Sequence, residues 1–553
     1  MKNPSKSRKA LKILIPVSLI LFTIVTGLVI YYIYYNLDYL KNLYYKETKI
    51  PTDFKAVNID ISEEERLKDF EKAYEYAVLS NPNSPEFENL YGFKFDKLYE
   101  TYRDAVSDCE DEFDYYFYVN SFFRSVPSGH TVLPLQTPAK ARSIGFELIG
   151  ECGLSKDEDD YLNAWQNCLM EGCLKYDFEN TKFDTFLYLD GEYIHEVTDD
   201  SNINWTKLLE INGLTPSELV LEPFQYYMID YDYMNNVAYR QAFTINDTYG
   251  TPVTVKLQLN DGTIITKESY IDDKYNFAYD VFTDFYPEEI EEAENDDSNN
   301  TIKEYKPYSI AVDEEYDLVY VNTTTCTSVG MDTFNEEFKA ALEGHDNVIL
   351  DIRDNTGGDA DFCSEYLYSN LFSKDFVVDD KITMTKNDMT QIWAKNPDNK
   401  TYFQIVDNNN GTYSYVTSRE YNGLSDKDYN IYVLTSNKTF SSGDLIASTL
   451  GSFDNVTLIG NNTGGEGREG YIFMSLLPYS HMIVAYTPGK NYNISPADGV
   501  YGTLPDICSI NGLDEMIKRT ELDNAGLDHN EYENKKIWDK TLNETLELIK
   551  KRD

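Results

Sequence analysis

The chain has 553 residues, of which 42 % are hydrophobic and 14 % aromatic, so it is long enough to bury the cores of several domains. Its 95 acidic residues outnumber the 48 basic ones and give it a formal net charge of −47 at pH 7. A protein with this charge repels the phosphates of nucleic acids, which argues against a nucleic-acid partner.

The first 35 residues predict a membrane anchor. Positions 1–12 hold five basic residues and no acidic one. Positions 13–35 are uncharged, long enough to cross a hydrocarbon core of about 30 Å, and end in four tyrosines, which are typical of a membrane interface. The alternative is a cleaved signal peptide, but the apolar run is longer than a signal core and no Ala-x-Ala-like site follows it. The basic residues predict that positions 1–12 are cytoplasmic and that the rest lies outside a cell membrane crossed once.

Residues 36–137 predict a small helical cap. Apolar side chains recur three and four positions apart at 67–77 and 98–105, and an aromatic run of the same kind covers 115–123. The helical pattern ends before the turn Gly129-His130-Thr131. A histidine in a turn is often an ordinary polar loop residue, so the turn alone assigns it no role.

Residues 138–285 change to short strands and turns, the pattern of a β-rich domain. Alternating residues at 253–259 predict a half-buried strand. Ser143-Ile-Gly-Phe146 resembles the loop by which PDZ domains receive a chain terminus, and residues 205–218 are similar to a PDZ strand followed by a helix. This resemblance implies a PDZ-like domain, although the insert at 154–177 departs from it. The alternative is a β-rich domain that binds no chain terminus.

Residues 286–306 are strongly acidic and too poor in apolar residues to pack, so we expect a solvated linker there. In residues 307–553, apolar strands alternate with amphipathic helices, which predicts an α/β core. The whole chain is therefore expected to be a mixed α/β (α+β) multidomain protein.

Two apolar strands in this core each end at a turn of small residues. The strand at 347–350 leads to Asp351-Ile-Arg-Asp-Asn-Thr-Gly-Gly358, and the strand at 429–435 leads to Ser441-Ser-Gly-Asp444 and an apolar helix. Such turns gather hydroxyls and backbone N–H groups, as a nucleophile and an oxyanion hole require. Taken singly, each also fits an ordinary strand-to-helix turn.

Taken together, the two turns resemble the tail-specific, or C-terminal-processing, serine peptidases, a family that includes the core domain of the tricorn protease. In that family one strand ends in Asp-Φ-Arg-x-Asn-x-Gly-Gly, where Φ is apolar, and a later one in Ser-x-x-Glu/Asp; residues 351–358 and 441–444 match both. A following Gly-x-x-Thr-x-Gly turn is matched by residues 460–465. The resemblance implies a ClpP/crotonase-like α/β fold for the core and hydrolysis of peptide bonds.

The resemblance also implies roles for individual residues. Ser441 stands where the family has its nucleophile, and Ser442 is the competing choice. The backbone N–H groups of Ser442 and of Gly358 or Gly357 resemble the family's oxyanion hole, where glycine allows the backbone to come close to the substrate.

The general base separates two branches of the family. The bacterial tail-specific branch uses a lysine in a Thr-x-Gly-Lys-Gly turn, but this chain reads Thr463-Gly-Gly-Glu-Gly467, so Glu466 holds the lysine position. The tricorn-like branch uses a histidine, and Gly129-His130-Thr131 resembles its turn, although that branch has a serine in place of Gly129. His130 is thus the candidate base, and its reacting atom should approach that of Ser441 to about 3–4 Å.

In the tricorn-like branch a glutamate orients the pair, a few residues before a Gly-x-x-Pro-Asp turn. Gly502-Thr-Leu-Pro-Asp506 matches that turn, and the nearest acid, Asp498, is one place off. Asp498 is therefore the candidate orienting acid, and Glu466 is the alternative.

The seven cysteines include no Cys-x-x-Cys pair and no histidine set at zinc spacing, so we expect neither a metal nor a cofactor. Cys152, Cys168 and Cys173 are close enough in sequence for one disulfide in an oxidising compartment.

The leading prediction is a membrane-anchored, extracytoplasmic serine endopeptidase that acts on protein or peptide substrates. A second hypothesis, favoured by the missing lysine, is an inactive relative that binds chain termini or small apolar ligands. A third is a surface scaffold whose PDZ-like domain tethers partners.

Overall fold

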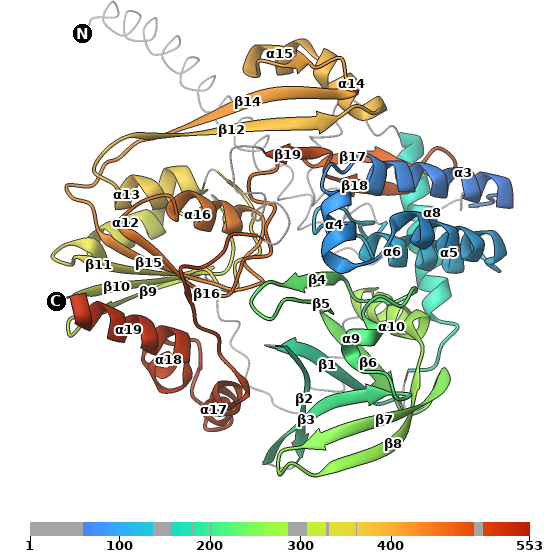
Figure 1. Ribbon diagram of the computed structural model, residues 1–553, viewed down its shortest axis with the longest axis horizontal. Helices are drawn as coiled ribbons and strands as arrows, with labels where there is room; N and C mark the ends of the chain where they lie inside the picture. Colours follow the sequence, from blue (N-terminus) through green and yellow to red (C-terminus); the bar gives the residue numbers. More distant parts are fainter. Residues whose placement is uncertain are drawn as a thin grey trace, which may run out of the picture.

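The computed structural model describes residues 59–136, 156–178, 181–189, 191–199, 202–285, 307–327, 331–360, 362–491 and 502–552. Within these ranges the chain is a mixed α/β protein with a helical cap, a β-barrel and an α/β core (Figure 1). None of the helices in these ranges is both long and apolar enough to cross a membrane. The predicted span at 13–35 and the acidic linker at 286–306 lie outside the described residues.

The cap consists of aromatic-rich helices that pack on one another. They are α3 (Glu63–Tyr74) with the π-helical turn η1 (Glu75–Leu79), α4 (Ser84–Tyr91), α5 (Phe95–Asp108) and α6 (Glu112–Arg124). Ser62 and Glu65 form a capping box that starts α3, and the Asp111 side chain accepts the Asp114 N–H at the start of α6. Phe70 and Phe122 meet edge to face in the core, with ring centroids 5.0 Å apart. The helical patterns predicted at 67–77, 98–105 and 115–123 are confirmed.

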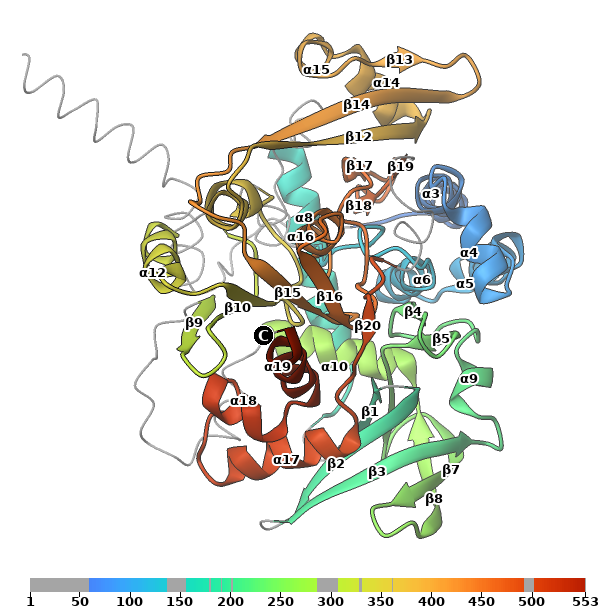
Figure 2. The same cartoon turned by 60° about the vertical axis from the view of Figure 1, so that its left-hand side comes forward.

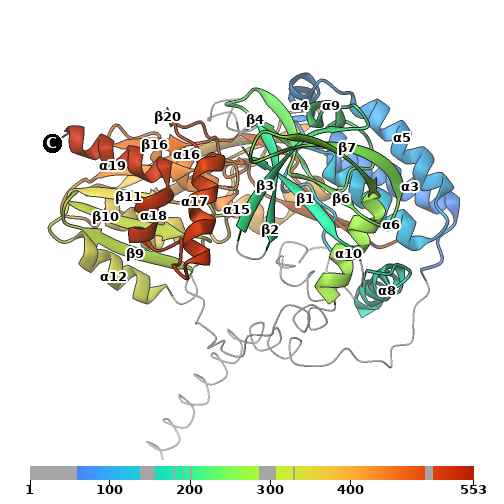
Figure 3. The same ribbon diagram turned by 90° about the horizontal axis from the view of Figure 1, so that it is seen from below.

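The β-rich region closes into a barrel in the order β1-β2-β3-β7-β8-β6. Its strands are β1 (Phe183–Leu189), β2 (Glu192–Asp199), β3 (Asn202–Ile211), β6 (Ala242–Asn246), β7 (Thr251–Leu259) and β8 (Ile264–Ile271). A separate hairpin joins β4 (Ile229–Asp232) to β5 (Val237–Arg240), and the helices are α8 (Lys156–Cys173), α9 (Pro216–Leu219) and α10 (Asp273–Phe285). Figure 3 shows the barrel between the cap and the C-terminal helices, which are drawn in red.

The segment at 205–218 forms the predicted strand, turn and helix. After β3 the chain reverses at Asn212 and Gly213, whose φ angles are 53° and 80°, and Thr215 and Glu218 form the capping box of α9. The loop at 143–146 lies outside the described residues, so the PDZ-like assignment stays a prediction. The insert at 154–177 contains α8, in which Cys168 and Cys173 are free thiols.

The core is built on a six-stranded sheet in the order β20-β16-β15-β11-β10-β9. The strands are β9 (Tyr308–Asp313), β10 (Leu318–Thr323), β11 (Asn347–Asp351), β15 (Asn430–Thr435), β16 (Val456–Gly460) and β20 (Ile507–Cys508). All neighbours are parallel except β9, which is antiparallel to β10. The carboxyl ends of the parallel strands therefore meet along one edge, where the motifs after β11 and β15 are brought together.

Helices cover both faces of this sheet (Figure 2). Val319 and Val321 of β10 pack in one apolar cluster with α12 (Asp332–Leu342), η3 (Cys363–Tyr368), α13 (Ser369–Leu371) and α16 (Ser442–Leu450). Leu318 and Tyr320, which alternate with them, pack against α18 (Tyr532–Trp538) and α19 (Lys540–Arg552). This two-sided burial explains the continuous apolar runs in the strands. Helix α17 (Leu513–Asn524) precedes α18.

An arm extends from the core between β11 and β15. Its sheet has the order β13-β14-β12-β19, with β12 (Phe376–Thr385), β13 (Val406–Asp407), β14 (Thr412–Tyr421) and β19 (Gly489–Asn491). Helices α14 (Asp388–Lys395) and α15 (Pro397–Tyr402) lie on the arm, and β17 (Phe473–Leu476) pairs with β18 (Ile483–Tyr486). The bridge between Val132 and Ala485 joins the β18 strand to the chain just after the cap.

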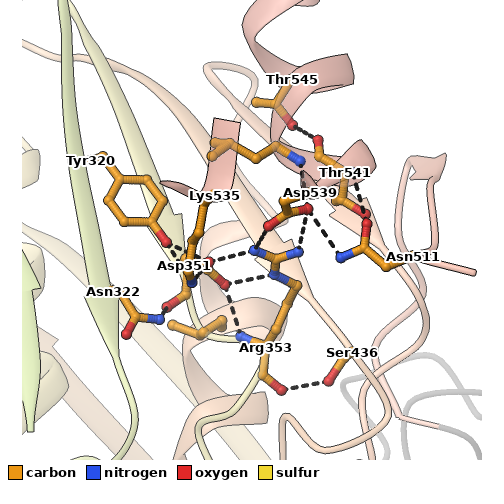
Figure 4. Close-up of polar contacts among 12 residues, drawn as sticks. Tyr320, Asn322, Asp351, Arg353, Ser436, Asn511, Lys535, Asp539, Thr541 and Thr545 are labelled. Carbon is orange, nitrogen blue, oxygen red and sulfur yellow. Dashed lines mark hydrogen bonds and ion pairs between the residues drawn. The ribbon is translucent and has the colours of Figure 1, made fainter. Parts of the chain in front are cut away.

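Buried charges tie the end of β11 to the C-terminal helices (Figure 4). The Arg353 guanidinium donates to Asp351 through Nε at 2.8 Å and Nη2 at 2.6 Å, and to Asp539 through Nη1 at 2.9 Å. The Lys535 ammonium donates to Asp351 at 3.0 Å. Burial alone would raise the pKa of Asp351, but the charges of Arg353 and Lys535 hold it well below its usual range. The network fixes the end of β11, from which the loop with Gly357 and Gly358 leaves the sheet.

We expect Asp539→Ala to destabilise the fold strongly, because it leaves part of the buried Arg353 charge without a counter-ion. Removing one partner of such a pair costs about 3–5 kcal/mol in free energy of unfolding. Urea denaturation followed by fluorescence measures this loss. Glu315→Ala, which breaks the exposed pair with Lys550, should shift the midpoint little. An Asp539→Ala midpoint equal to that of the parent would contradict a stabilising role for this network.

Candidate active site

The loop after β15 presents Ser441 in a strained conformation. Ser441 has φ 54° and ψ −122°, a region that non-glycine residues seldom occupy, and it immediately precedes α16. The loop holds this conformation through two backbone bonds: Phe440 N–H donates to Asn355 O and Ser441 N–H donates to Gly465 O, both at 3.0 Å. Backbone strain that the surroundings enforce is typical of functional sites, and here it lifts a hydroxyl above the start of a helix.

The structure brings His130 to Ser441 although 311 positions separate them. His130 Nε2 lies 3.1 Å from Ser441 Oγ, within the predicted 3–4 Å. The other ring nitrogen, Nδ1, lies 2.8 Å from Glu466 Oε2. Nε2 can accept the serine proton only if Nδ1 carries the ring hydrogen, and a carboxylate beside Nδ1 favours that tautomer.

Glu466 binds the whole His130 turn and not the ring alone. Its Oε1 accepts the Gly129 N–H at 2.8 Å, and its Oε2 accepts the His130 N–H at 2.9 Å. Burial opposes ionisation of Glu466, but the charge of His130 and hydrogen bonds from His130 and Ser128 lower its pKa below the usual value. Glu466 is thus a carboxylate that both places and orients the imidazole. Asp498, the other candidate acid, lies outside the described residues.

The loop after β11, residues 352–358, is the candidate oxyanion loop. It contains two glycines with positive φ, 98° at Gly357 and 129° at Gly358. A Cβ at Gly357 would lie 2.7 Å from Ser441 Cβ, and one at Gly358 would lie 2.1 Å from Cys326 O, so neither position has room for a side chain. The Gly357 N–H is not available to a substrate, because it donates to Asn355 Oδ1 at 2.9 Å. This corrects the assignment of Gly357 as an oxyanion donor. Its role is to let the backbone of this loop come close to Ser441.

Gly358 and Ser442 remain as the candidate oxyanion donors. The Gly358 N–H makes no hydrogen bond to any residue that the structure describes. The Ser442 N–H belongs to the first residue of α16, where backbone donors point out of the helix. The Ser442 hydroxyl donates to Gly358 O at 2.7 Å and so joins the two loops. Ser442 therefore positions the oxyanion loop, and its Oγ does not face His130 Nε2.

Two further residues, Phe440 and Asp444, shape the site, although the sequence predicts no role for them. The Phe440 ring packs against His130, with centroids 4.7 Å apart, and a Cβ at residue 129 would lie 2.5 Å from Phe440. That contact explains why Gly129 precedes the histidine. Asp444 is buried and accepts from Thr463 Oγ1 at 2.6 Å and from Gly467 N–H at 2.9 Å, which holds the turn carrying Glu466. The Ser-x-x-Asp motif signalled Asp444, whereas nothing local signals Phe440.

A cavity of about 840 Å³ opens beside these residues. Its walls come from the cap, the barrel, the β4–β5 hairpin, the core and α17; among them are Tyr91, Ser128, Gly129, Leu187, Asp230, Tyr239, Thr356, Asn437, Gly465, Glu466 and Met516. Thr356 and Glu466 place the cavity against both the oxyanion loop and the histidine turn. A site of this kind, with a hydroxyl, an oriented imidazole and the backbone N–H groups of two turns next to a large pocket, is suited to acyl transfer.

One comparison with known proteins gives a family match in the core. Residues 317–508 match the model of peptidase family S41. A comparison with curated protein sequences finds no match. The chain is similar to a structure of mature CPAF complexed with lactacystin, with 13 % identity, a TM-score of 0.48, and coverage of 84 % of this chain and 97 % of that one.

Two other solved structures are similar over most of the chain. One is the photosystem II D1 C-terminal processing protease, with 12 % identity, a TM-score of 0.35 and coverage of 81 % of this chain and 93 % of that one. The other is the tricorn protease, with 14 % identity, a TM-score of 0.33 and coverage of 89 % and 37 %. Because these scores are below 0.5, the finding that links the chain to a family is the match of residues 317–508 to the model of peptidase family S41.

Proposed function

We propose that the chain is a serine endopeptidase in which Ser441 attacks the peptide carbonyl, His130 is the general base and Glu466 orients His130. The observation that carries the proposal is the continuous relay from Glu466 Oε2 to His130 Nδ1 at 2.8 Å and from His130 Nε2 to Ser441 Oγ at 3.1 Å. Three groups from three separate segments meet within hydrogen-bonding distance and in the order that base-assisted attack requires.

The reaction follows from the positions of these atoms. His130 Nε2 takes the Ser441 proton as Oγ bonds to the carbonyl carbon, and the resulting imidazolium is stabilised by Glu466. The N–H groups of Gly358 and Ser442 stabilise the negative charge that develops on the carbonyl oxygen. His130 then returns the proton to the leaving amine. A water molecule, deprotonated by the same nitrogen, hydrolyses the acyl-enzyme.

The position of Glu466 removes the main argument for the hypothesis that the chain is an inactive relative. That hypothesis arose because the turn at 463–467 has glutamate in place of the lysine base. In this chain the turn supplies the acid of a histidine-based relay, so a base is present on another segment. The cavity of about 840 Å³ lies within the size range of pockets that enclose drug-sized ligands, which supports binding several residues of a peptide.

A fluorophosphonate probe tests the proposal directly, since it reacts quickly only with an activated serine. Purified protein should be labelled at Ser441, and protein denatured by heat before the probe is added should not be labelled. Peptides blocked at both ends separate the two modes of cleavage, because an endopeptidase cuts them and an exopeptidase does not. Absence of labelling together with absence of cleavage of any peptide would refute the enzyme assignment.

We further propose that positions 13–35 anchor the enzyme in a cell membrane with the catalytic part outside the cytoplasm. The support is the uncharged run of the sequence and the basic residues before it. After extraction with alkaline carbonate, the full-length chain should remain with the membranes. Recovery of a soluble form that begins near residue 36 would show that the segment is a cleaved signal peptide.

A further inference from the structure

Asp230 lies on the wall of the active-site cavity, on the hairpin between the barrel and the core (Figure 1). It belongs to β4 and stands opposite Tyr239 of β5. The Tyr239 hydroxyl donates to Asp230 Oδ2 at 3.0 Å and accepts from Asn437 Nδ2 at 2.9 Å. Asn437 is in the loop that carries Ser441, so two hydrogen bonds connect Asp230 to the nucleophile loop.

The carboxylate of Asp230 has no cationic partner among the described residues. It accepts two hydrogen bonds, from the Tyr239 hydroxyl and from the Tyr231 N–H at 2.7 Å, whereas a carboxylate can accept about four. The charged groups that act most strongly on it, Glu466 and Asp232, are both acidic. Burial, with these two acids, raises the pKa of Asp230 to about 6, so it is charged at neutral pH.

The surrounding walls are suited to a long side chain with a charge at its end. Apolar side chains of the barrel and hairpin line the cavity, among them Leu187, Ile194, Trp205, Met228 and Ile229. Lysine and arginine bury their hydrocarbon stems along such surfaces while the charged end reaches a polar group. Two basic residues, Lys438 and Arg519, also line the cavity, but neither bonds to Asp230.

We propose that Asp230 determines specificity by binding a cationic group of the substrate near the scissile bond. This inference deepens the proposed function and rests on it. The cation comes either from a lysine or arginine side chain within the peptide or from a free N-terminal amine. The observed apolar walls favour the side chain, since an N-terminal amine has no hydrocarbon stem to bury.

The test compares kcat/KM for blocked peptides that differ only in one residue next to the scissile bond, lysine or its uncharged isostere norleucine. The parent enzyme should prefer lysine, and Asp230→Asn should lower kcat/KM for the lysine peptide about 10- to 100-fold while norleucine changes little. Norleucine turnover also shows that the variant is folded. Glu196→Gln removes an acid from another wall of the same cavity and should leave most of the preference intact.

Each outcome has a distinct meaning. If the parent cleaves both peptides equally and Asp230→Asn changes neither, the inference fails and the peptidase assignment stands. If unblocked peptides are cleaved much faster than blocked ones whichever of the two residues they carry, and Asp230→Asn removes that advantage, the cation is the N-terminal amine. No cleavage of any peptide overturns the proposed function itself. Asp230→Lys should reverse the preference towards a glutamate peptide, a gain that misfolding cannot produce.

The preference should also disappear in acid. Below about pH 6 Asp230 is neutral, so the ratio of kcat/KM for lysine over norleucine should fall towards one. The ratio cancels pH effects on the steps that both peptides share. Groups that face Asp230 are Tyr239 on β5, Tyr91 on α4, Asp232 on β4 and Glu466. In Asp230→Asn the ratio should not vary with pH; a parent ratio that is constant from pH 5 to 8 would overturn the inference.

Discussion

Ser441→Ala should abolish peptide hydrolysis, with kcat falling roughly 10⁴- to 10⁶-fold, because among the described residues only the Ser441 hydroxyl is hydrogen-bonded to His130 Nε2. The fold should persist, since the Ser441 loop is held by backbone bonds to Asn355 and Gly465 that alanine can make. Hydrolysis of a blocked fluorogenic peptide measures the loss, and thermal unfolding checks the fold. His130→Ala should be nearly as damaging, and the double variant should be no worse than either, because the residues act as one unit.

Ser442→Ala is the matched control, since the two serines are adjacent and only one faces the histidine. Alanine keeps the N–H that the oxyanion requires and loses the hydroxyl that donates to Gly358 O. The expected loss is about tenfold or less, the effect of one hydrogen bond that positions a loop. If instead Ser441→Ala cleaves as fast as the parent, or Ser442→Ala is the inactive variant, the nucleophile assignment is wrong.

The sequence predicts those parts of the site whose position depends only on where a buried strand ends at a turn. Residues 351–358 and 441–444 each follow a buried strand, and parallel pairing of β11 with β15 places both turns at one sheet edge. The same logic could not distinguish Gly357 from Gly358, because the choice depends on where the Asn355 side chain points. It also could not place His130, which reaches the site from the cap through tertiary packing; only the resemblance to the tricorn-like branch predicted its approach to Ser441.

Glu466 shows a different limit of sequence reasoning. Its turn aligns with the lysine turn of the other branch, so the sequence indicates a missing base and offers Glu466 only as the alternative to Asp498 for the orienting acid. In the structure Glu466 has φ 62°, and its side chain is directed to the histidine turn, where it makes three contacts. Backbone conformation and the approach of a segment more than 330 positions away decided its role. Neither is visible in a local pattern.

Glu466→Gln should therefore lower kcat by about 10⁴-fold with little change in KM, the effect expected when the base is held in the wrong tautomer. A carboxylate accepts from Gly129, from the His130 backbone and from His130 Nδ1, and all three are donors. Glutamine has one acceptor oxygen and one NH₂ group, so one of its ends must face a donor. If the NH₂ group takes the place of Oε2, it donates to Nδ1 and the ring hydrogen moves to Nε2, which then cannot accept the Ser441 proton. If it takes the place of Oε1, it faces the Gly129 N–H, and the neutral amide no longer stabilises the imidazolium.

Asp498→Asn is the control that separates the two candidate acids, because it tests the residue favoured by the Gly-x-x-Pro-Asp turn. If Glu466 orients His130, Asp498→Asn should keep kcat within a few-fold of the parent, and fluorophosphonate labelling should slow only in Glu466→Gln. A hydrogen resonance from His130 Nδ1, shifted far downfield by the carboxylate in the parent, should be lost in Glu466→Gln and kept in Asp498→Asn. The reverse pattern, full activity in Glu466→Gln and an inactive Asp498→Asn, would assign the orienting role to Asp498.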